Sequence, residues 1–421
     1  MSTYVPGRLL HLLCRLLAAG LLPVAGLLLS STILVTPAEA AKKGKSGVVV
    51  KTMTYNAGLG SGLSARFAMS LDEFCDKAGE NVREIDASKP RVRMPAIAEN
   101  ILKKKPDLVG LQEADAVLTQ TPADNGPLLG GTSASTVRYD YIQLILDRLN
   151  RGKERYRLVT VHDELEFEIK ANIDGVGSGC DDSETDARLI TRNAILARVG
   201  AGVATSTVRQ ENYRHQVAFE LLEGIPIPVP RGWESVDASV GGSKKFRFVH
   251  THLEAFDNDP LENTMLDTAK DPPTSTVVSN AAVRAIQADE LVEGPAKAEI
   301  PVVLLGDINS NVPGVKPGDE KAFQRILAAR FKRRSTQKPP SCCIEESGTT
   351  ADFDHVVDHI MGKPGRKIRL VSSSVVGRTK VNGLFPSDHA GVFSALRVPR
   401  KLTRRPARSP VGSHPRRRPD D

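Results

Sequence analysis

The feature that most constrains the fold is a series of short apolar runs, rich in β-branched residues and bounded by turn residues. Runs of this length and composition predict β-strands. They lie at residues 47–55, 106–112, 157–161, 188–199, 215–222, 245–253, 300–308, 353–361 and 391–398. Because they recur through most of the chain, we expect them to pair into sheets that are covered by other elements.

Segments with helical spacing lie between these runs. Apolar residues recur three or four positions apart in residues 91–105, 140–150 and 280–294, which predicts amphipathic helices. Early elements follow a strand–helix–strand order, whereas later strands follow one another through turns. This predicts mixed sheets covered by helices, an α/β (α+β) fold. Residues 57–91 and 254–279 are weakly patterned and rich in Gly, Asp, Pro or Ser, so we expect loops that rim a site.

Polar side chains recur where the predicted strands end. Asn56 and Glu113 end the first two runs, and further polar residues lie near or just beyond later runs: His252, Asp307, Asn309, Asp388 and His389. If these strands are neighbours, the side chains converge on one edge, where open α/β folds bind ligands. Carboxylate and amide oxygens suit Mg²⁺, or Mn²⁺ or Ca²⁺, rather than zinc or copper. No CxxC or Cys/His cluster with zinc spacing occurs in the sequence.

Each motif has an ordinary structural interpretation when it is taken alone. GDIN is usually a turn, LQE a strand followed by a helix cap, THL a buried histidine, and SDH a strand cap. Their order is more informative. TYN, LQE, THLE, GDIN, DHI and SDH all follow apolar runs and span residues 54–389.

Those six motifs, in that order, resemble the endonuclease/exonuclease/phosphatase superfamily with its deoxyribonuclease-I-like fold. The resemblance extends to about residue 398 and implies a four-layer sandwich of two β-sheets flanked by helices, in one domain. Three other features are similar to an exported bacterial branch: VPRGWESV at 229–236, the adjacent pair Cys342 and Cys343, and VNGLFPSDHAG at 381–391.

The resemblance implies a role for each motif residue. Glu113 would bind the divalent metal, Asn56 would lie beside it, and Asp388 would supply a further carboxylate near it. Asp307 and Asn309 would activate or position the attacking water and hold the phosphate.

The remaining motif residues would act on the phosphate. His252 would contact the phosphate or the leaving group, and His389 would contact the phosphate. Asp358 would orient His389 by accepting its other ring proton. A metal ion, a positioned water and donors to the phosphate are what phosphate ester hydrolysis requires.

Three neighbouring residues compete for such roles. Arg192 in TRNAILAR resembles a position that touches substrate phosphate, although it fits a solvated arginine at a strand end equally well. His250 lies two residues before His252 and therefore on the same strand face. Asp354 similarly rivals Asp358. The THL and DHI motifs favour His252 and Asp358.

The net charge of +7 belongs to the two ends of the chain. Basic residues exceed acidic ones by six from Arg400 onwards and by one in residues 1–40, so residues 41–399 are neutral. We expect residues 400–421 to be a basic disordered tail, with contact to an anionic surface or nucleic acid as the alternative. A neutral body weakly disfavours tight duplex binding.

The amino end has the pattern of an export signal. Two arginines precede an uncharged run at residues 16–35, and Ala38-Glu39-Ala40 matches a signal peptidase site. We therefore expect a signal peptide at 1–40, a mature enzyme domain at 41–399, and a secreted or periplasmic protein. An uncleaved membrane anchor is the alternative.

Four cysteines would remain after removal of the signal peptide: Cys75, Cys180, Cys342 and Cys343. Four cysteines allow three pairings, and the sequence alone fixes none of them. A bond between the adjacent pair is strained, which favours a bridge from Cys342 or Cys343 to Cys75 or Cys180.

Together these patterns predict an exported, divalent-metal-dependent phosphodiesterase, including nuclease activity. We expect a monomer without an obligate protein partner. The alternatives are a phosphomonoesterase, a sphingomyelinase-like phospholipase, and a non-catalytic binding protein on the same scaffold. A binding protein would have lost Glu113, Asp307 or His389, and the chain retains all three.

Overall fold

The computed structural model describes residues 47–401 except 69, 128–129, 182–183, 222–224, 256–262, 271–273, 316–319, 337 and 345–352. The predicted signal peptide, and the predicted tail beyond residue 401, lie outside the described residues. No helix within the described ranges is both long and apolar enough to cross a membrane.

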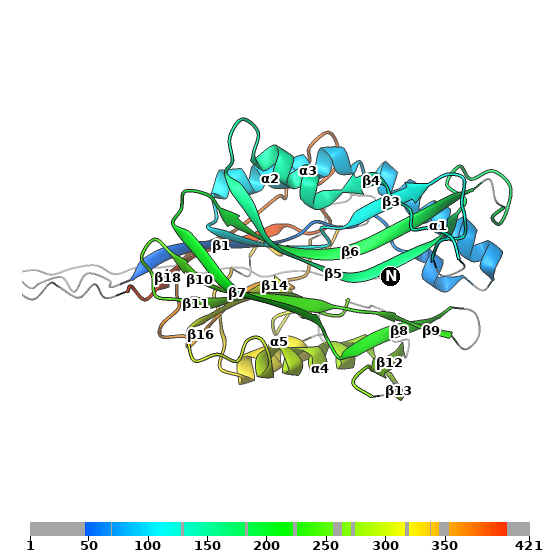
Figure 1. The fold of residues 1–421 in the computed structure, drawn as a ribbon. Helices are drawn as coiled ribbons and strands as arrows, with labels where there is room; N and C mark the ends of the chain where they lie inside the picture. Colours follow the sequence, from blue (N-terminus) through cyan, green and yellow to red (C-terminus); the bar gives the residue numbers. More distant parts are fainter. Residues whose placement is uncertain are drawn as a thin grey trace, which may run out of the picture. The chain divides into compact units, whose positions relative to one another are not determined.

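Two β-sheets face each other and form the centre of the fold (Figure 1). The first has the strand order β17-β18-β1-β2-β6-β3-β4, with β5 paired to β6. Its strands are β1 (Val48–Asn56), β2 (Leu108–Gln112), β3 (Ala116–Gln120), β4 (Thr136–Asp140), β5 (Tyr156–Ala171), β6 (Thr185–Arg198), β17 (Arg369–Val376) and β18 (Gly391–Val398).

The second sheet has the order β15-β16-β14-β11-β10-β7. Its strands are β7 (Val203–Asn212), β10 (Gly232–Val240), β11 (Phe246–His252), β14 (Val302–Asp307), β15 (Lys332–Arg333) and β16 (Asp358–Lys363). A smaller sheet, β13-β12-β8-β9, contains β8 (His215–Leu221), β9 (Ile225–Val229), β12 (Asn263–Asp267) and β13 (Thr274–Val278).

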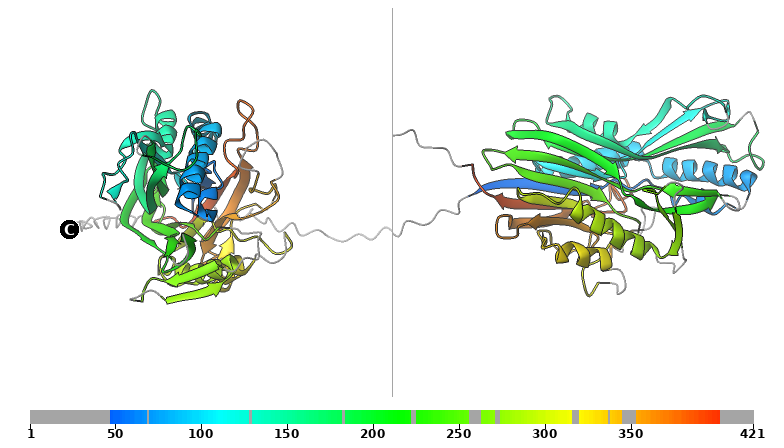
Figure 2. Two further views of the ribbon diagram at one scale, coloured as in Figure 1. Left: turned by 90° about the vertical axis from the view of Figure 1, so that its right-hand side faces the viewer. Right: turned by 60° about the horizontal axis from the view of Figure 1, so that its bottom comes forward.

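Helices cover the outer faces of both large sheets. Helices α2 (Pro90–Lys104) and α3 (Tyr141–Leu149) pack on the first sheet through Ile97 and Ile145. Helices α4 (Asn280–Glu293) and α5 (Lys321–Ala328) pack on the second through Leu291 and Phe323. A third apolar cluster fills the space between the sheets and includes Val50, Phe248 and Val303. Figure 2 shows these layers from two further sides. The predicted four-layer α/β fold is therefore confirmed.

All of the predicted strands and helices are present, but the prediction of two long loops was wrong. Residues 57–91 contain a 3₁₀ turn, Ser64–Phe67, and helix α1, Leu71–Ala87. Residues 254–279 contain β12 and β13. The sequence analysis also did not predict α5, β3, β4, β7, β9, β10, β15 or β17.

Tertiary contacts explain why α1 was missed. Ser70 caps the helix by accepting a hydrogen bond from the backbone N–H of Glu73. Its buried face includes Phe74, whose ring centroid lies 6.0 Å from that of Phe167 on β5. Gly79 interrupts the apolar pattern because a Cβ there would collide with the backbone carbonyl of Asn172.

The disulfide expectation was also wrong. Cys75 pairs with Cys180, with a Cα–Cα distance of 5.8 Å, and Cys342 pairs with Cys343. The loop before Cys180 lies on α1, where the Asn172 side chain donates to the Asp76 carboxylate at 3.0 Å. The other two cysteines lie in a different part of the fold, so the cross-pairing that we expected does not form.

Candidate active site

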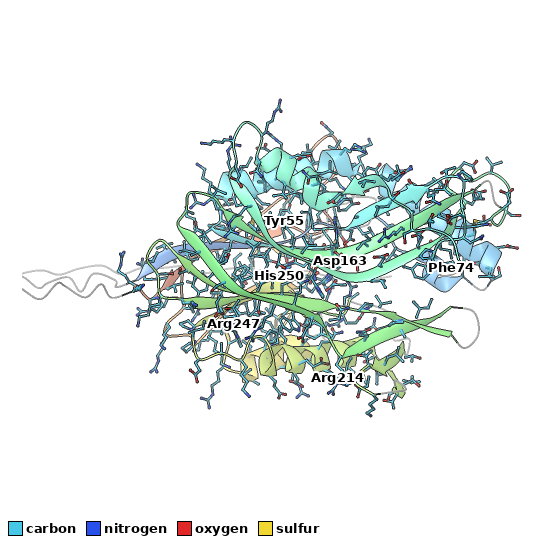
Figure 3. The ribbon with its side chains drawn as sticks, viewed as in Figure 1. Tyr55, Phe74, Asp163, Arg214, Arg247 and His250 are labelled. Carbon is cyan, nitrogen blue, oxygen red and sulfur yellow. A yellow bond between two sulfur atoms is a disulfide. The ribbon has the colours of Figure 1, made fainter. Side chains whose placement is uncertain are left out.

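Strand alternation directs several predicted site residues into the space between the sheets. Val303 and Leu305 of β14 lie in the core between the sheets, so Asp307 points to the same side. Figure 3 shows His250 of β11 between the sheets, and His252 follows it with the same orientation. Asp307 and His252, which end these two strands, therefore point into the space between the sheets rather than toward the helices.

Strand pairing brings the ends together at one edge. Strands β1 and β2 are parallel, so Asn56 and Glu113 emerge side by side. In the second sheet, Asp307 pairs with His252 of parallel β11 on one side and with Asp358 of antiparallel β16 on the other. The predicted convergence of these residues is therefore found in the structure.

An amide joins two carboxylates across the sheets. The Nδ2 group of Asn56 donates to Oε1 of Glu113 at 2.8 Å and to Oδ2 of Asp307 at 3.1 Å. Its Oδ1 accepts the backbone N–H of Gly58 at 2.9 Å, and Oε2 of Glu113 accepts that of Leu59 at 2.9 Å. Asn56 and Asp307 are buried, whereas the Glu113 side chain is 26% exposed. Glu113 is therefore the carboxylate that solutes reach first.

His389 lies between two aspartates. Its Nδ1 is 3.0 Å from Oδ2 of Asp358, and its Nε2 is 3.6 Å from Oδ2 of Asp307. The backbone N–H of His389 donates to the Ser387 hydroxyl, which in turn donates to the backbone carbonyl of Asn56. These bonds hold the SDH segment against the end of β1.

His252 faces the same acidic space from β11. Its Nε2 lies 3.7 Å from Oδ2 of Asp307 and 3.9 Å from Oε1 of Glu113. Its Nδ1 lies 3.3 Å from Nη1 of Arg231. Both predicted histidines therefore direct Nε2 toward Asp307.

Two other predicted residues lie at the margin. Asp388 is half-buried, and its Oδ1 lies 3.0 Å from the Ser387 hydroxyl oxygen, as the second acceptor near that group. The backbone N–H of Asn309 donates to Asp307 at 2.9 Å, and its Nδ2 donates to the carbonyl of Leu253 at 3.1 Å. In this arrangement the Asn309 side chain holds the loop that follows His252.

The structure contradicts one interpretation of Arg192, that of a solvated arginine, and its contact with substrate phosphate stays a prediction. Its guanidinium donates to the Asp140 carboxylate at 2.7 Å and to the carbonyls of Ala114 and Asp115. It therefore supports the backbone directly after Glu113 and is not a solvated arginine.

The rival residues have other partners. Nδ1 of His250 lies 2.8 Å from the Glu234 carboxyl, and its Nε2 contacts Gln112. Asp354 contacts the ring of its neighbour His355. The THL and DHI motifs thus select the members of each pair that lie at the strand-end cluster.

Comparison with known proteins identifies the family to which the chain belongs. A model of the endonuclease/exonuclease/phosphatase family matches residues 53–389. The chain belongs to this family. Family members hydrolyse phosphate esters, and they generally depend on a divalent metal ion; the chain is accordingly a phosphoester hydrolase. A comparison with the curated proteins finds no match.

A comparison with solved structures finds many with a similar fold, among them the following three. An endonuclease/exonuclease/phosphatase family protein from Bacteroides thetaiotaomicron is 12% identical over 83% of this chain and 95% of its own, with a TM-score of 0.46. A mannosyl-6-phosphatase from the same organism is 13% identical over 82% and 99%, with a TM-score of 0.45. The human Nocturnin catalytic domain with bound sulfate is 14% identical over 83% and 93%, with a TM-score of 0.43.

The donor atoms of this family member fit a hard divalent cation. Glu113 and Asp307 present carboxylate oxygens to one cluster, in which the Nδ2 group of Asn56 joins them while its Oδ1 accepts the N–H of Gly58, and the Cys342 and Cys343 sulfurs are paired with each other. The group Asp307, Asp358 and His389 also brings three potential ligand atoms within 4.8 Å of one another. Asp358 is already engaged with His389. Glu113 and Asp307 are therefore the carboxylates best placed to hold the ion, and the roles of Asn56 and Asp388 as ligands stay predictions, since the Asn56 oxygen accepts from Gly58 and Asp388 contacts Ser387.

Burial and neighbouring charges determine which of these groups are protonated. Burial raises the pKa of Asp307 to about 7, Asp358 adds to the rise, and His389 opposes it. Burial alone would lower the pKa of His389, but the carboxylates of Asp358 and Asp307 outweigh it and raise that pKa well above its usual range. Burial, reinforced by Arg231, lowers the pKa of His252 well below its usual range. One histidine of the site is thus cationic and the other is neutral near pH 7.

The sequence analysis missed three contributors to the site. Arg231 lies in the VPRGWESV segment, but no pattern linked it to His252. Ser387 lies within SDH yet was not given a role. The Cys342–Cys343 disulfide places its sulfurs 3.4 Å and 4.0 Å from Nε2 of His389. The adjacent cysteines were a visible signal, but their contact with His389 follows only from the fold.

Proposed function

We propose that this protein is an exported, magnesium-dependent phosphodiesterase that hydrolyses its substrate by in-line attack of water, with nucleic acid as the leading substrate class. The observation that carries the proposal is the position of Asp307. Its carboxylate is buried between two histidine Nε2 atoms, at 3.6 Å and 3.7 Å, and is tied through Asn56 to Glu113. A base, two donors and a metal-binding carboxylate therefore lie within reach of a single phosphate.

Each residue of the site has its own role in the proposed reaction. Asp307 holds the attacking water and accepts its proton, which requires the ionised carboxylate. His389, kept protonated by Asp358, donates to the phosphate and supplies a proton to the departing oxygen, while His252 donates from Nε2 to a nonbridging oxygen. A bound divalent cation would neutralise charge on the nonbridging oxygens. Each positioned group typically contributes about 10²-fold or more to the rate.

The charge of the site does not separate diesters from monoesters. Two cationic groups, His389 and Arg231, lie among the carboxylates of Glu113, Asp307 and Asp358. A bound divalent cation would add two positive charges, so the occupied site would accept either a monoanionic diester or a dianionic monoester. Monoester hydrolysis remains the alternative outcome of the test below.

The export part of the proposal depends on the sequence and on cysteine pairing. The signal-like residues 1–40 predict passage across a membrane. The Cys75–Cys180 and Cys342–Cys343 disulfides suit an oxidising compartment outside the cytoplasm.

The test is hydrolysis of bis(p-nitrophenyl) phosphate by purified residues 41–421, with Mg²⁺ and with EDTA, beside an Asp307→Asn variant. We expect turnover with Mg²⁺ that EDTA and the substitution both abolish. A parallel assay with p-nitrophenyl phosphate measures the monoester. Faster hydrolysis of the monoester, or no metal-dependent turnover with Mg²⁺, Mn²⁺ or Ca²⁺, would overturn the proposal. A panel of nucleic acids and phospholipids then separates the diester substrates.

A further inference from the structure

Arg231 occupies a defined place at the edge of the second sheet. It directly precedes β10, which runs antiparallel to β11 with Trp233 opposite Thr251. The start of β10 and the end of β11 therefore meet where His252 enters the site. The Arg231 carbonyl accepts the backbone N–H of Tyr213 at 2.8 Å, and the Gly232 carbonyl accepts the Thr251 hydroxyl at 3.1 Å. The backbone that carries Arg231 is thus fixed on both sides.

The contact between Arg231 and His252 determines where the ring proton lies. A guanidinium has only N–H donors and does not lose its proton in proteins. The His252 Nδ1 atom, 3.3 Å from Nη1 of Arg231, must therefore accept through its lone pair. A neutral ring whose Nδ1 accepts carries its hydrogen on Nε2.

The Nε2–H group of His252 faces the catalytic space. Asp307 and Glu113 lie 3.7 Å and 3.9 Å from Nε2, which is longer than a direct hydrogen bond. An oxygen atom of substrate or water in contact with Nε2 would accept its hydrogen. The His252 ring is thus set up to donate, and it has no second proton to release.

The two histidines have opposite partners on Nδ1. Asp358 places a carboxylate against His389, which favours an imidazolium, whereas Arg231 places a cation against His252, which excludes one. We propose that Arg231 is a positioning residue that holds His252 in the Nε2–H tautomer, so that His252 donates to a phosphate oxygen. The donation to phosphate rests on the proposed function, but the tautomer does not.

The charge of Arg231 is maintained by its surroundings. Burial opposes a charged guanidinium, but the carboxylates of Glu254 and Glu164, and then those of Glu113 and Asp307, outweigh that effect and raise the pKa of Arg231. The cation beside His252 is therefore present throughout the pH range in which the enzyme folds.

The direct test is nitrogen NMR of the protein labelled with ¹⁵N-histidine, at pH 8 and without metal. His252 is assigned by loss of its signals in a His252→Gln variant. We expect a protonated Nε2 and an unprotonated Nδ1 in the wild type. In Arg231→Met, we expect a mixture of tautomers. An imidazolium or an Nδ1–H ring in the wild type, or an unchanged tautomer in Arg231→Met, would overturn the inference.

Arg192→Met is the matched control. Arg192 is also a largely buried arginine close to Glu113, but its partners are Asp140 and backbone carbonyls rather than a histidine. Its replacement should leave the His252 signals unchanged. Arg231→Lys keeps a cationic donor and should retain most of the Nε2–H form. It therefore keeps the inference testable if Arg231→Met does not fold.

Kinetics then separate positioning from substrate binding. If Arg231 acts through His252, Arg231→Met should lower kcat by about 10- to 100-fold with KM little changed, and Arg231→Lys should recover part of the loss. A rise in KM at unchanged kcat would instead make Arg231 a substrate ligand. If the wild type shows no diester hydrolysis, the proposed function fails, and the NMR measurement still decides the tautomer.

Discussion

The imidazole of His389 and the carboxylate of Asp358 form a buried pair, with Nδ1 of the ring 3.0 Å from Oδ2 of the aspartate. The other oxygen of Asp358, Oδ1, is buried and has no hydrogen-bond partner among the described residues. The side chain of Asp358 therefore acts mainly on His389, by orienting the ring and stabilising its protonated form. Substitution of Asp358 is accordingly a selective test of the mechanism.

Asp358→Asn should lower kcat by about 10²-fold or more while KM changes little. The amide no longer stabilises the imidazolium, so His389 loses both its proton and its fixed orientation. Steady-state kinetics on a diester substrate measure the effect, and circular dichroism checks the fold. Asp354→Asn is the matched control, because Asp354 contacts His355 rather than His389. Wild-type kcat in Asp358→Asn would contradict the assigned role.

The rate should depend on pH with a maximum above neutrality. Asp307 must lose its proton to act as a base, so the rate rises as pH passes its pKa, which burial raises to about 7. His389 must keep its proton, and its raised pKa places the loss of activity at higher pH. The two apparent pKa values describe the coupled pair of Asp307 and His389 rather than either residue alone.

Metal binding and mutation should shift the acid limb and the alkaline limb of the pH–rate profile separately. Rising Mg²⁺ concentration favours ionised Asp307 and should shift the acid limb to lower pH. Asp358→Asn removes the carboxylate that favours the imidazolium and should shift the alkaline limb to lower pH. A rate that falls steadily between pH 6 and pH 9 would rule out this assignment of base and acid.

The sequence predicted the strands that carry the site residues, and the edge at which those strands end, because both depend on local pattern. The GDIN and DHI motifs end or begin apolar runs, and the alternation of each run directs Asp307 and Asp358 between the sheets. Local pattern contains this information because side-chain direction has a period of two along any strand.

The missed features depend on contacts between distant segments. Gly79 obscures α1 in the sequence, and its reason is the backbone of Asn172, which lies elsewhere in the chain. The link between Arg231 and His252 exists only because β10 pairs with β11. No periodicity or spacing encodes such contacts, so they could not be predicted without the fold.

A buried acid between the sheets should make stability depend on pH. Burial raises the pKa of Glu234 to about 8 and lowers the pKa of His250 to about 3, so near neutrality the carboxyl donates to Nδ1 of the neutral ring, 2.8 Å away. The folded state therefore binds the Glu234 proton more tightly than the unfolded state. The Glu234 contribution should fall as pH rises from about 4.5 to about 8, by up to about 1.4 kcal/mol per pH unit, and the lowered pKa of His250 opposes it below about pH 6.5, so the net loss of stability is expected between about pH 6.5 and 8.

Glu234→Gln tests this dependence. The amide still donates to His250 but cannot ionise, so its free energy of unfolding should match the wild type near pH 5 and equal or exceed it at pH 8. Urea unfolding at both pH values measures the difference. Glu166→Gln serves as the control, because its side chain is 49% exposed and pairs with Arg188. Marked destabilisation of Glu234→Gln at pH 8 would show that the carboxylate is ionised in the fold.

Reduction of the Cys342–Cys343 disulfide should impair catalysis. Its sulfurs lie 3.4 Å and 4.0 Å from Nε2 of His389, the atom that faces the phosphate in the proposed mechanism. The same segment is bonded to the catalytic loops, since the N–H of Ile344 donates to the Asp388 carbonyl and the N–H of Ala390 donates to the Ser341 carbonyl. Free thiols would offer His389 competing hydrogen bonds and loosen that connection.

We expect reduction to lower kcat by at least about tenfold, a part of the roughly 10²-fold that a positioned acid contributes. The Cys342→Ser/Cys343→Ser double variant should have low activity that no longer responds to a reductant. The Cys75→Ala/Cys180→Ala double variant removes the other disulfide, which joins α1 to the connection between β5 and β6 and not to the His389 segment, and it should respond as the wild type does. If fully reduced wild type, verified by thiol titration, keeps its kcat, the disulfide has no part in holding His389. Because thiol content and rate are measured on the same sample, incomplete reduction cannot be mistaken for that result.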